Sequence, residues 1–312
     1  MAIVALDKRL SDLVHPNVAV EKIATGFVFT EGPVWHSREH HLTFSDVFGA
    51  VMYRWTEAGG AVVLRKPSGG ANGNTYDRQG RLVTCQHDRR VTRTSADGSV
   101  EEIATHFEGK RLNSPNDIVC AANGDLLFTD PTFGLQPRMA PDGKEQPQET
   151  PFAGVYRLSA RDGSLTLLAD DFVAPNGIVL SPDQRRLYVD DSRQQHVRVF
   201  DVGRDGRLSN GRVFAEVKHG ETAGLPDGMK MDSEGNLYVA ANTNEGIWVF
   251  DPEGTLLGFI GVGEEKHRFR EGLGGPANLA WGGDDWRTLY VTAVSSVYRL
   301  RMKVAGQAVV IA

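Results

Sequence analysis

The apolar residues of this chain fall into short runs separated by turn-forming residues, and the runs recur in sets of four. Each set opens with a run that follows a stretch rich in Gly, Asn and Asp, and a turn then leads to a second run that begins with leucine. The first runs begin at Glu31, Asn72, Asn116, Asn176, Asp227 and Ala277. The second runs begin at Leu42, Leu82, Leu126, Leu187, Leu237 and Leu289.

Two further β-rich runs follow in each set. The third runs lie at 52–55, 91–94, 155–158, 197–200, 247–250 and 297–300. The fourth runs lie at 61–64, 100–104, 165–169, 212–216 and 255–259. Four short strands repeated six times, at intervals of roughly 40 to 60 residues, are typical of a β-propeller. The sequence therefore predicts an all-β fold, a six-bladed β-propeller with four-stranded antiparallel blades around a central channel.

The fourth strand of the last blade has two candidates. Residues 308–311 follow the last third run, and residues 19–25, which precede the first set, resemble the fourth run of the second set. Either segment could supply the outer strand, and the pattern leaves the choice open.

We expect residues 1–312 to form one domain, because no linker-like or low-complexity stretch divides the chain. Residues 1–17 form an N-terminal extension in this interpretation. Residues 131–153 form the longest insertion, in the third blade, and we expect it to hang over one mouth of the channel as a lid or wall.

The formal net charge is −6 and no cluster of Lys or Arg occurs, so nucleic acid and anionic membranes are not expected partners. The start of the chain lacks the long apolar core and the cleavage site that are typical of a signal peptide, and no run approaches the roughly eighteen apolar residues of a membrane-spanning helix. We expect a cytoplasmic monomer or homodimer. Cys85 and Cys120 fall on different predicted blades, which indicates two reduced thiols and no disulfide.

Five of the six first positions carry a side-chain oxygen where a strand would otherwise hold an apolar residue. In a four-stranded antiparallel blade the start of the first strand lies on the same face of the disc in every blade, so these side chains should meet at one mouth of the channel. The expected site residues are Glu31, Asn72, Asn116, Asn176 and Asp227. Carboxylate and amide oxygens favour Ca²⁺, Mg²⁺ or Mn²⁺, although Zn²⁺ or Fe²⁺ could bind.

The alternative is that the Asn-Gly and Asp-Gly pairs only make turns. Glu31 argues against it, because glutamate forms turns poorly and is costly to bury without a partner. His87 is placed at the same mouth and could contact a substrate, and Asp130 could contact a substrate or accept a structural hydrogen bond. We expect Asp46 and Asp191 to be structural. His36, His40 and His41 are predicted to be surface residues on the opposite face.

Several motifs in order resemble the gluconolactonase, senescence marker protein (regucalcin) and luciferin-regenerating enzyme family. The motifs are Thr30-Glu31-Gly32-Pro33-Val34-Trp35, Ser114-Pro115-Asn116-Asp117, Phe128-Thr129-Asp130-Pro131, Ala174-Pro175-Asn176-Gly177-Ile178 and Leu225-Pro226-Asp227-Gly228. The resemblance implies a six-bladed propeller with one catalytic divalent metal, held here by Glu31, Asn176 and Asp227. It also implies that Asn116 contacts the metal or the substrate. The stretches around Asn72 and His87 look most like the bacterial gluconolactonase branch.

The expected reaction is hydrolysis of a sugar lactone, with Ca²⁺ as the first choice of metal. The metal would activate water, and Asp227 would act as a ligand and as the general base. Attack without Asp227 as the proton acceptor remains open, because a carboxylate bound to a dication is a weak base. Two other functions also remain open, namely hydrolysis of a phosphotriester or fluorophosphate at the same metal and calcium binding without catalysis.

Overall fold

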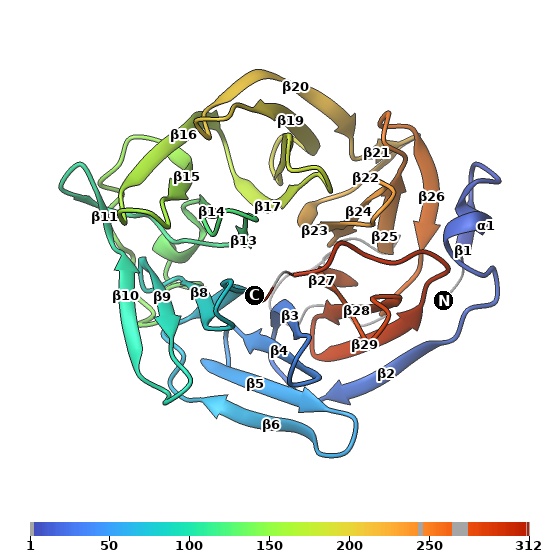
Figure 1. The fold of residues 1–312 in the computed structure, drawn as a ribbon, viewed down its shortest axis with the longest axis horizontal. Coiled ribbons are helices and arrows are strands. Elements are labelled where there is room, and N and C mark those ends of the chain that lie inside the picture. Colours follow the sequence, from blue (N-terminus) through green and yellow to red (C-terminus); the bar gives the residue numbers. More distant parts are fainter. Residues whose placement is uncertain (1–2, 243–245, 264–273, 310, 312) are drawn as a thin grey trace.

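The computed structural model describes residues 3–242, 246–263, 274–309 and 311. Within these residues, six main sheets stand radially around a central channel, as Figure 1 shows. Five of the sheets have four strands and one has five, and two short two-stranded ribbons complete the strand set. The prediction of an all-β six-bladed propeller is confirmed.

The blades follow the order of the sequence repeats. The innermost strands are β3 (Thr30–His36), β7 (Ala71–Tyr76), β13 (Ile118–Cys120), β17 (Pro175–Leu180), β23 (Pro226–Met231) and β27 (Pro276–Gly282). The second strands are β4 (His41–Asp46), β8 (Leu82–Gln86), β14 (Leu126–Asp130), β18 (Arg186–Asp191), β24 (Leu237–Ala241) and β28 (Thr288–Ala293). The third strands are β5 (Val51–Thr56), β9 (Arg90–Thr94), β15 (Ala153–Leu158), β19 (His196–Val202), β25 (Gly246–Phe250) and β29 (Ser296–Arg301).

The outer strands are β6 (Gly60–Arg65), β10 (Val100–Ala104), β16 (Leu165–Phe172), β20 (Leu208–Glu216), β26 (Leu256–Ile260) and, for the last blade, β2 (Val20–Thr25). The remaining elements are β1 (Ile3–Ala5), α1 (Leu10–Leu13), the short 3-10 helix η1 (Phe133–Leu135) and two ribbons, β11 (His106–Phe107) with β12 (Lys110–Arg111) and β21 (Lys218–His219) with β22 (Thr222–Ala223). No helix among the described residues has the length and apolar character needed to cross a membrane.

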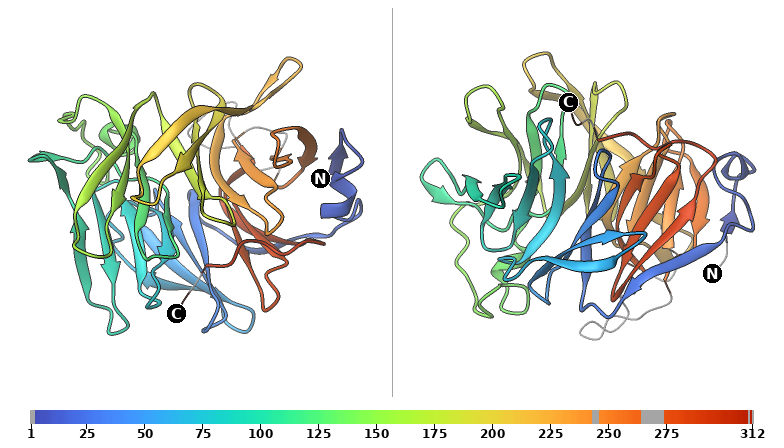
Figure 2. Two further views of the ribbon diagram at one scale, coloured as in Figure 1. Left: turned by 45° about the horizontal axis from the view of Figure 1, so that its top comes forward. Right: turned by 60° about the horizontal axis from the view of Figure 1, so that its bottom comes forward.

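The N-terminal segment closes the ring. Strand β2 pairs antiparallel with β29, with Val20 opposite Leu300, and runs along the outer edge of the last blade in Figures 1 and 2. Strand β1 adds a fifth strand to the preceding blade by pairing with β26. Of the two candidates for the outer strand of the last blade, residues 19–25 are therefore the correct one.

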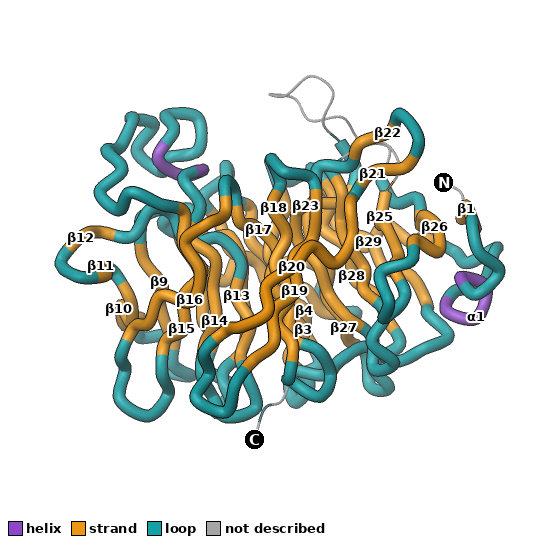
Figure 3. Tube along the Cα trace, turned by 90° about the horizontal axis from the view of Figure 1, so that it is seen from above, coloured by secondary structure: helices purple, strands orange, loops and turns teal. Residues whose placement is uncertain are grey.

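The C-terminal segment does not supply the outer strand of the last blade. The Gln307 backbone amide donates to the Met231 carbonyl, and Val309 and Ile311 pack against a buried cluster that includes Val34 and Tyr76. In Figure 3 the last loop before the grey trace marked C lies on the face of the disc opposite to the 3-10 helix, which is drawn in purple at the upper left. The described residues of the apolar run near the C-terminus, 308, 309 and 311, thus lie at the far mouth of the channel and belong to no strand.

The core lies between neighbouring blades. One buried cluster joins Tyr188 and Val199 of the fourth blade to Met229 and Trp248 of the fifth. The Trp248 ring also meets Phe259 edge-on, with centroids 4.7 Å apart. Because each inner strand packs against both of its neighbours, its position around the channel is fixed by apolar contacts on two sides.

The prediction of surface histidines is wrong for two of the three. His40 is exposed, but His36 and His41 are buried, because they extend β3 and β4 to the tip of their hairpin and pack against the next blade. Their rings stack with centroids 5.1 Å apart, and His41 Nε2 lies 3.0 Å from the Tyr76 hydroxyl. The sequence pattern could not show this contact between blades.

Burial lowers the pKa of His41 from 6.5 to about 4, and the charges of Arg54 and His36 act in the same direction. The Glu39 carboxylate lies 3.5 Å from His41 Nδ1. Because the Glu39 side chain is 57% exposed, solvent screens its charge and it affects His41 little. His41 is therefore neutral in the folded protein at pH values where the unfolded chain is already protonated.

We expect the free energy of unfolding to fall as the pH decreases from 6.5 to 4, because the unfolded chain takes up a proton that folded His41 resists. Since one pKa unit corresponds to about 1.4 kcal/mol, His41 contributes up to about 3 kcal/mol to this loss. Urea unfolding across this pH range should give a shallower pH dependence for His41→Leu than for the wild type. Replacing the exposed His106 with leucine is the control, and equal slopes for all three proteins would contradict the assignment.

Candidate metal centre

A cavity of about 150 Å³ opens at the mouth of the channel where the inner strands begin. Its walls bring together the five oxygen-bearing first positions, which come from five different blades: Glu31, Asn72, Asn116, Asn176 and Asp227. All five side chains are buried. Residues of the insertion, including Phe133 and Met139, line the same cavity. The sixth first position, Ala277, brings no polar group.

Local β-bulges lie at four of these five first positions, whereas Asn116 precedes β13 and has no such bulge in the described pairing. The pairing of β3 with β4 shifts between Glu31 and Val34, and the same shift occurs in β7, β17 and β23 at the corresponding positions. Glycine follows the bulged residue at Gly32, where φ is +50° and a Cβ atom would lie 2.0 Å from the Asn72 backbone oxygen. The Glu-Gly, Asn-Gly and Asp-Gly pairs therefore form bulges inside these four strands, and the alternative that they only make turns does not hold there.

Hydroxyl groups hold neighbouring blades in register at this level. Ser45 Oγ donates to the Asn72 carbonyl at 2.8 Å, and Thr129 Oγ1 donates to the Asn176 carbonyl at 2.7 Å. In each case a second strand fixes the backbone of the first position in the next blade. The positions of the site residues are thus set by the packing of the ring.

The three asparagines form a chain of hydrogen bonds around the mouth. Asn72 Nδ2 donates to Asn116 Oδ1 at 2.5 Å, and Asn116 Nδ2 donates to Asn176 Oδ1 at 2.7 Å. A half-turn of a terminal amide exchanges its oxygen and its nitrogen, so each side chain can present an oxygen to a cation.

Glu31 is 3% exposed and forms no ion pair with any of the residues that the structure describes. Its Oε2 accepts hydrogen bonds from the Gly32 amide at 2.8 Å and from Asn278 Nδ2 at 3.1 Å. Burial raises the pKa of Glu31 to about 7, with a smaller contribution from the Asp117 carboxylate, and Lys230 opposes the rise weakly. A carboxylate buried in this way is stabilised by a bound dication.

The residue that directly follows the second strand supports the first position of the same blade in three cases. His87 Nε2 lies 3.0 Å from Asn72 Nδ2, Ser192 Oγ accepts from Asn176 Nδ2 at 3.0 Å, and Asn242 donates to Asp227 Oδ2. Sequence reasoning identified only His87 of these three. The common signal is a polar residue immediately after the second strand, and it could have identified the others.

His87 itself does not line the cavity. It is 1% exposed, and its Nδ1 lies 3.3 Å from the Met139 carbonyl of the insertion. Burial lowers the pKa of His87 to about 4, so the ring is neutral, with Nδ1 donating to Met139 and Nε2 accepting from Asn72. Any effect of His87 at the cavity would therefore be indirect, through Asn72 and the insertion.

Asp130 also lies behind the cavity wall. It is fully buried, and its Oδ2 accepts from the Asn113 amide at 2.8 Å, close to the segment that carries Asn116. Burial raises the pKa of Asp130 to about 7. Asp46 and Asp191 accept backbone hydrogen bonds from the loops that enter β3 and β17, including those from Phe29 and Ala174. These three carboxylates organise the loops around the mouth.

The donor set suits a hard cation. Across the described part of the chain, no group of three or more His, Cys, Asp or Glu side chains is placed to hold a metal ion, so amide oxygens must contribute beside the two carboxylates. Oxygen donors of this kind fit Ca²⁺, Mg²⁺ or Mn²⁺ better than Zn²⁺. The residues at the cavity therefore fit the divalent metal that the sequence motifs imply.

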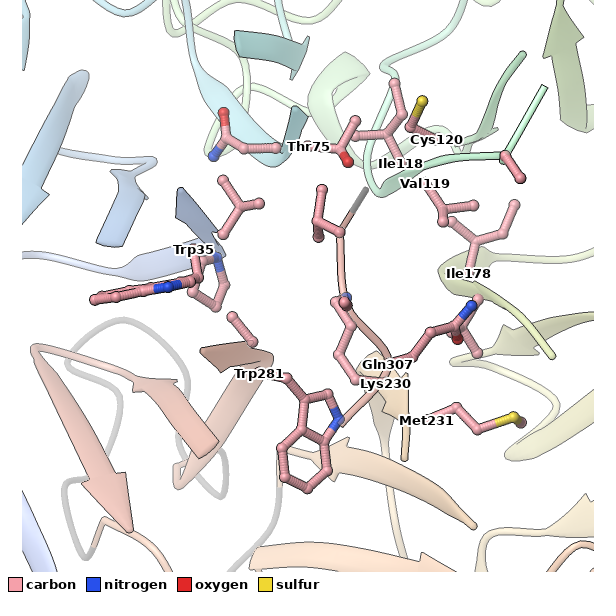
Figure 4. A pocket seen from close by; sticks show the side chains of 18 of the residues that line it. Trp35, Thr75, Ile118, Val119, Cys120, Ile178, Lys230, Met231, Trp281 and Gln307 are labelled. Carbon is pink, nitrogen blue, oxygen red and sulfur yellow. The ribbon is translucent and has the colours of Figure 1, made fainter. Parts of the chain in front are cut away.

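A second cavity, of about 80 Å³, occupies the far part of the channel (Figure 4). Its walls are mainly apolar and include Trp35, Ile118, Ile178 and Trp281, with Gln307 from the C-terminal segment. None of the described residues that line it is Asp, Glu or His. This end of the channel is therefore unsuited to a dication.

Known proteins with sequences similar to this chain include two lactonases. The family profile described as SMP-30/gluconolactonase/LRE-like region matches residues 29–295. The gluconolactonase of Zymomonas mobilis is 32% identical over 96% of this chain and 85% of that protein. The pentonolactonase of Haloferax volcanii is 28% identical over 84% of this chain and 80% of that protein.

Among solved structures, a gluconolactonase from Xanthomonas campestris is similar, with a TM-score of 0.84 and 32% identity over 97% of this chain and 95% of that chain. A luciferin-regenerating enzyme shares the fold, with a TM-score of 0.75 at 23% identity over 95% of this chain and 99% of that chain. The resemblance identified from the sequence motifs is confirmed, and the chain belongs to the SMP-30/gluconolactonase/LRE-like family.

Proposed function

We propose that this protein is a metal-dependent lactonase that opens a sugar lactone to the aldonic acid. The observation that supports the proposal is the convergence of two carboxylates and three amides, from five blades, on one cavity. The similarity to a gluconolactonase and a pentonolactonase along nearly the whole chain favours the same reaction class.

Glu31, Asn176 and Asp227 are the proposed metal ligands, and Ca²⁺ is the ion we expect. When bound, a dication polarises the lactone carbonyl and lowers the pKa of water. The closed ring of blades holds the ligands in place before substrate arrives, so little reorganisation is needed during the reaction.

Asp227 is the proposed general base. Asn242 donates to its carboxylate and fixes its orientation toward the cavity that both residues line. Asn116 and Asn72 are the proposed lactone-binding residues, and the proposal is supported because both side chains line the cavity and can donate or accept hydrogen bonds. Phe29, Phe133 and Leu225 cover other parts of the wall and limit the access of bulk water.

Removal and return of the metal tests the proposal. We expect protein dialysed against a chelator to lose hydrolysis of gluconolactone and of pentonolactones, and Ca²⁺ or Mn²⁺ to restore it. A parallel assay with paraoxon tests the phosphotriesterase alternative, and turnover of paraoxon above that of every lactone would overturn the assignment. Lactone turnover that survives complete chelation would overturn the metal dependence, and no turnover of any substrate with any metal would favour a binding protein.

A further inference from the structure

Two arginines lie at the rim of the cavity. Arg138 belongs to the insertion, and Arg193 follows Ser192 in the turn after β18. Both side chains are exposed, and neither forms an ion pair with a carboxylate among the described residues. The Arg138 guanidinium donates to Gln136 Oε1 at 3.0 Å, which leaves most of its donors for a ligand.

Among the residues that the structure describes, the charged ones that line the cavity are Glu31, Asp227, Arg138 and Arg193. A dication would balance the two carboxylates, and the two guanidinium groups would then leave a positive excess at the mouth. Beneath the lining, Asp117 already has a cationic partner, because Lys230 Nζ lies 3.8 Å from its Oδ2. The whole protein has a formal net charge of −6 and would repel anions in general. A positive mouth would therefore be a local feature of the cavity.

The two arginines approach the cavity from different elements. Arg193 is next to Ser192, which supports the proposed ligand Asn176, whereas Arg138 is near Met139, whose carbonyl meets His87. A lactone whose carbonyl faces the ligands would extend its remaining substituents toward this rim. Guanidinium groups form paired hydrogen bonds with carboxylate or phosphate oxygens, which makes them suited to an anionic substituent.

We propose that the preferred substrate is an anionic sugar lactone, one that carries a carboxylate or a phosphate away from the ester, and that Arg138 and Arg193 bind this anion. The inference rests on the proposed lactonase function and adds the substrate class. Binding, rather than the chemical step, depends on the two arginines, because they lie at the rim and do not belong to the ligand set.

The test compares gluconolactone, gluconolactone phosphorylated at its terminal hydroxyl and a lactone of glucaric acid, on metal-loaded protein. We expect KM to be lower for at least one anionic lactone than for gluconolactone, and the two anionic substrates distinguish phosphate from carboxylate recognition. Arg138→Gln and Arg193→Gln should each raise KM for that anionic lactone about tenfold, which corresponds to about 1.4 kcal/mol, with little change in kcat or in KM for gluconolactone.

Arg138→Lys and Arg193→Lys should restore part of the affinity, because they keep the charge but lose the paired geometry. Arg204→Gln, at an exposed arginine in the turn between β19 and β20, is the matched control. The proposal is overturned if gluconolactone has the lowest KM and the rim variants change all substrates equally. Hydrolysis of no lactone by any form would instead overturn the proposed function itself.

Discussion

Replacing Asp227 with asparagine is expected to lower kcat/KM for lactone hydrolysis by about 100- to 10,000-fold, the range that a general base usually contributes. The side chain is buried at the cavity, and asparagine keeps its size and its ability to accept a hydrogen bond from Asn242. The circular dichroism spectrum and the unfolding midpoint of the variant should therefore stay close to those of the wild type. Initial rates at saturating metal measure the effect.

The metal affinity of Asp227→Asn separates the two roles proposed for Asp227. Weaker metal binding together with lost activity indicates a ligand, whereas unchanged affinity with lost activity indicates that the carboxylate serves mainly as the proton acceptor. Asp205→Asn, at an exposed aspartate in the turn between β19 and β20, is the control and should be fully active. Wild-type turnover by metal-replete Asp227→Asn would show that neither role is correct.

Replacing Glu31 with glutamine should abolish the stabilisation of the fold by metal and raise the stability of the metal-free protein. The Glu31 carboxylate is 3% exposed, and the donors that it meets within the described part of the chain are neutral, so its charge is costly to bury without a dication. Glutamine fills the same space without the charge. Wild-type protein should gain about 2.7 kcal/mol of unfolding free energy when Ca²⁺ exceeds its Kd a hundredfold.

Thermal unfolding with a chelator measures the stability of the metal-free protein. Thermal unfolding with Ca²⁺ measures the stabilisation by metal. The matched control is Glu145→Gln, at an exposed glutamate of the insertion, which should respond to Ca²⁺ as the wild type does. A Glu31→Gln protein that still gains the full Ca²⁺-dependent stabilisation would remove Glu31 from the ligand set.

The repeat pattern predicts the blades closely because most inner and second strands are buried along their whole length, so each of them reads as a short apolar run between turns. The predicted run 100–104 coincides with β10, and the run 255–259 differs from β26 by one residue at each end. The five oxygen-bearing first positions could also be predicted to meet, because the same register in every blade puts them at one mouth. Closure by β2 could not be predicted, because residues 308–311 have the same apolar character and the contacts that place them lie across the channel.

The supporting residues were harder to predict, because their contacts depend on bulges. Asn278 reaches Glu31 because the pairing of β27 shifts between Pro276 and Asn278, so the polar side chain lies one residue beyond Ala277, the expected first position. Asn242 and Ser192 lie outside the strands, where their place directly after the second strand is the one sequence signal that marks them. A periodic pattern specifies which residues share a face, but the bulges and the loops decide which side chains touch.

The central claim is that Glu31, Asn176 and Asp227 together bind one divalent cation at the mouth of the channel. Crystals grown with Mn²⁺ and measured near its absorption edge test it most directly. We expect one strong anomalous peak per chain, within coordination distance of oxygens from these three side chains. A peak elsewhere, or no peak at this mouth in crystals of protein that hydrolyses lactones, would contradict the claim.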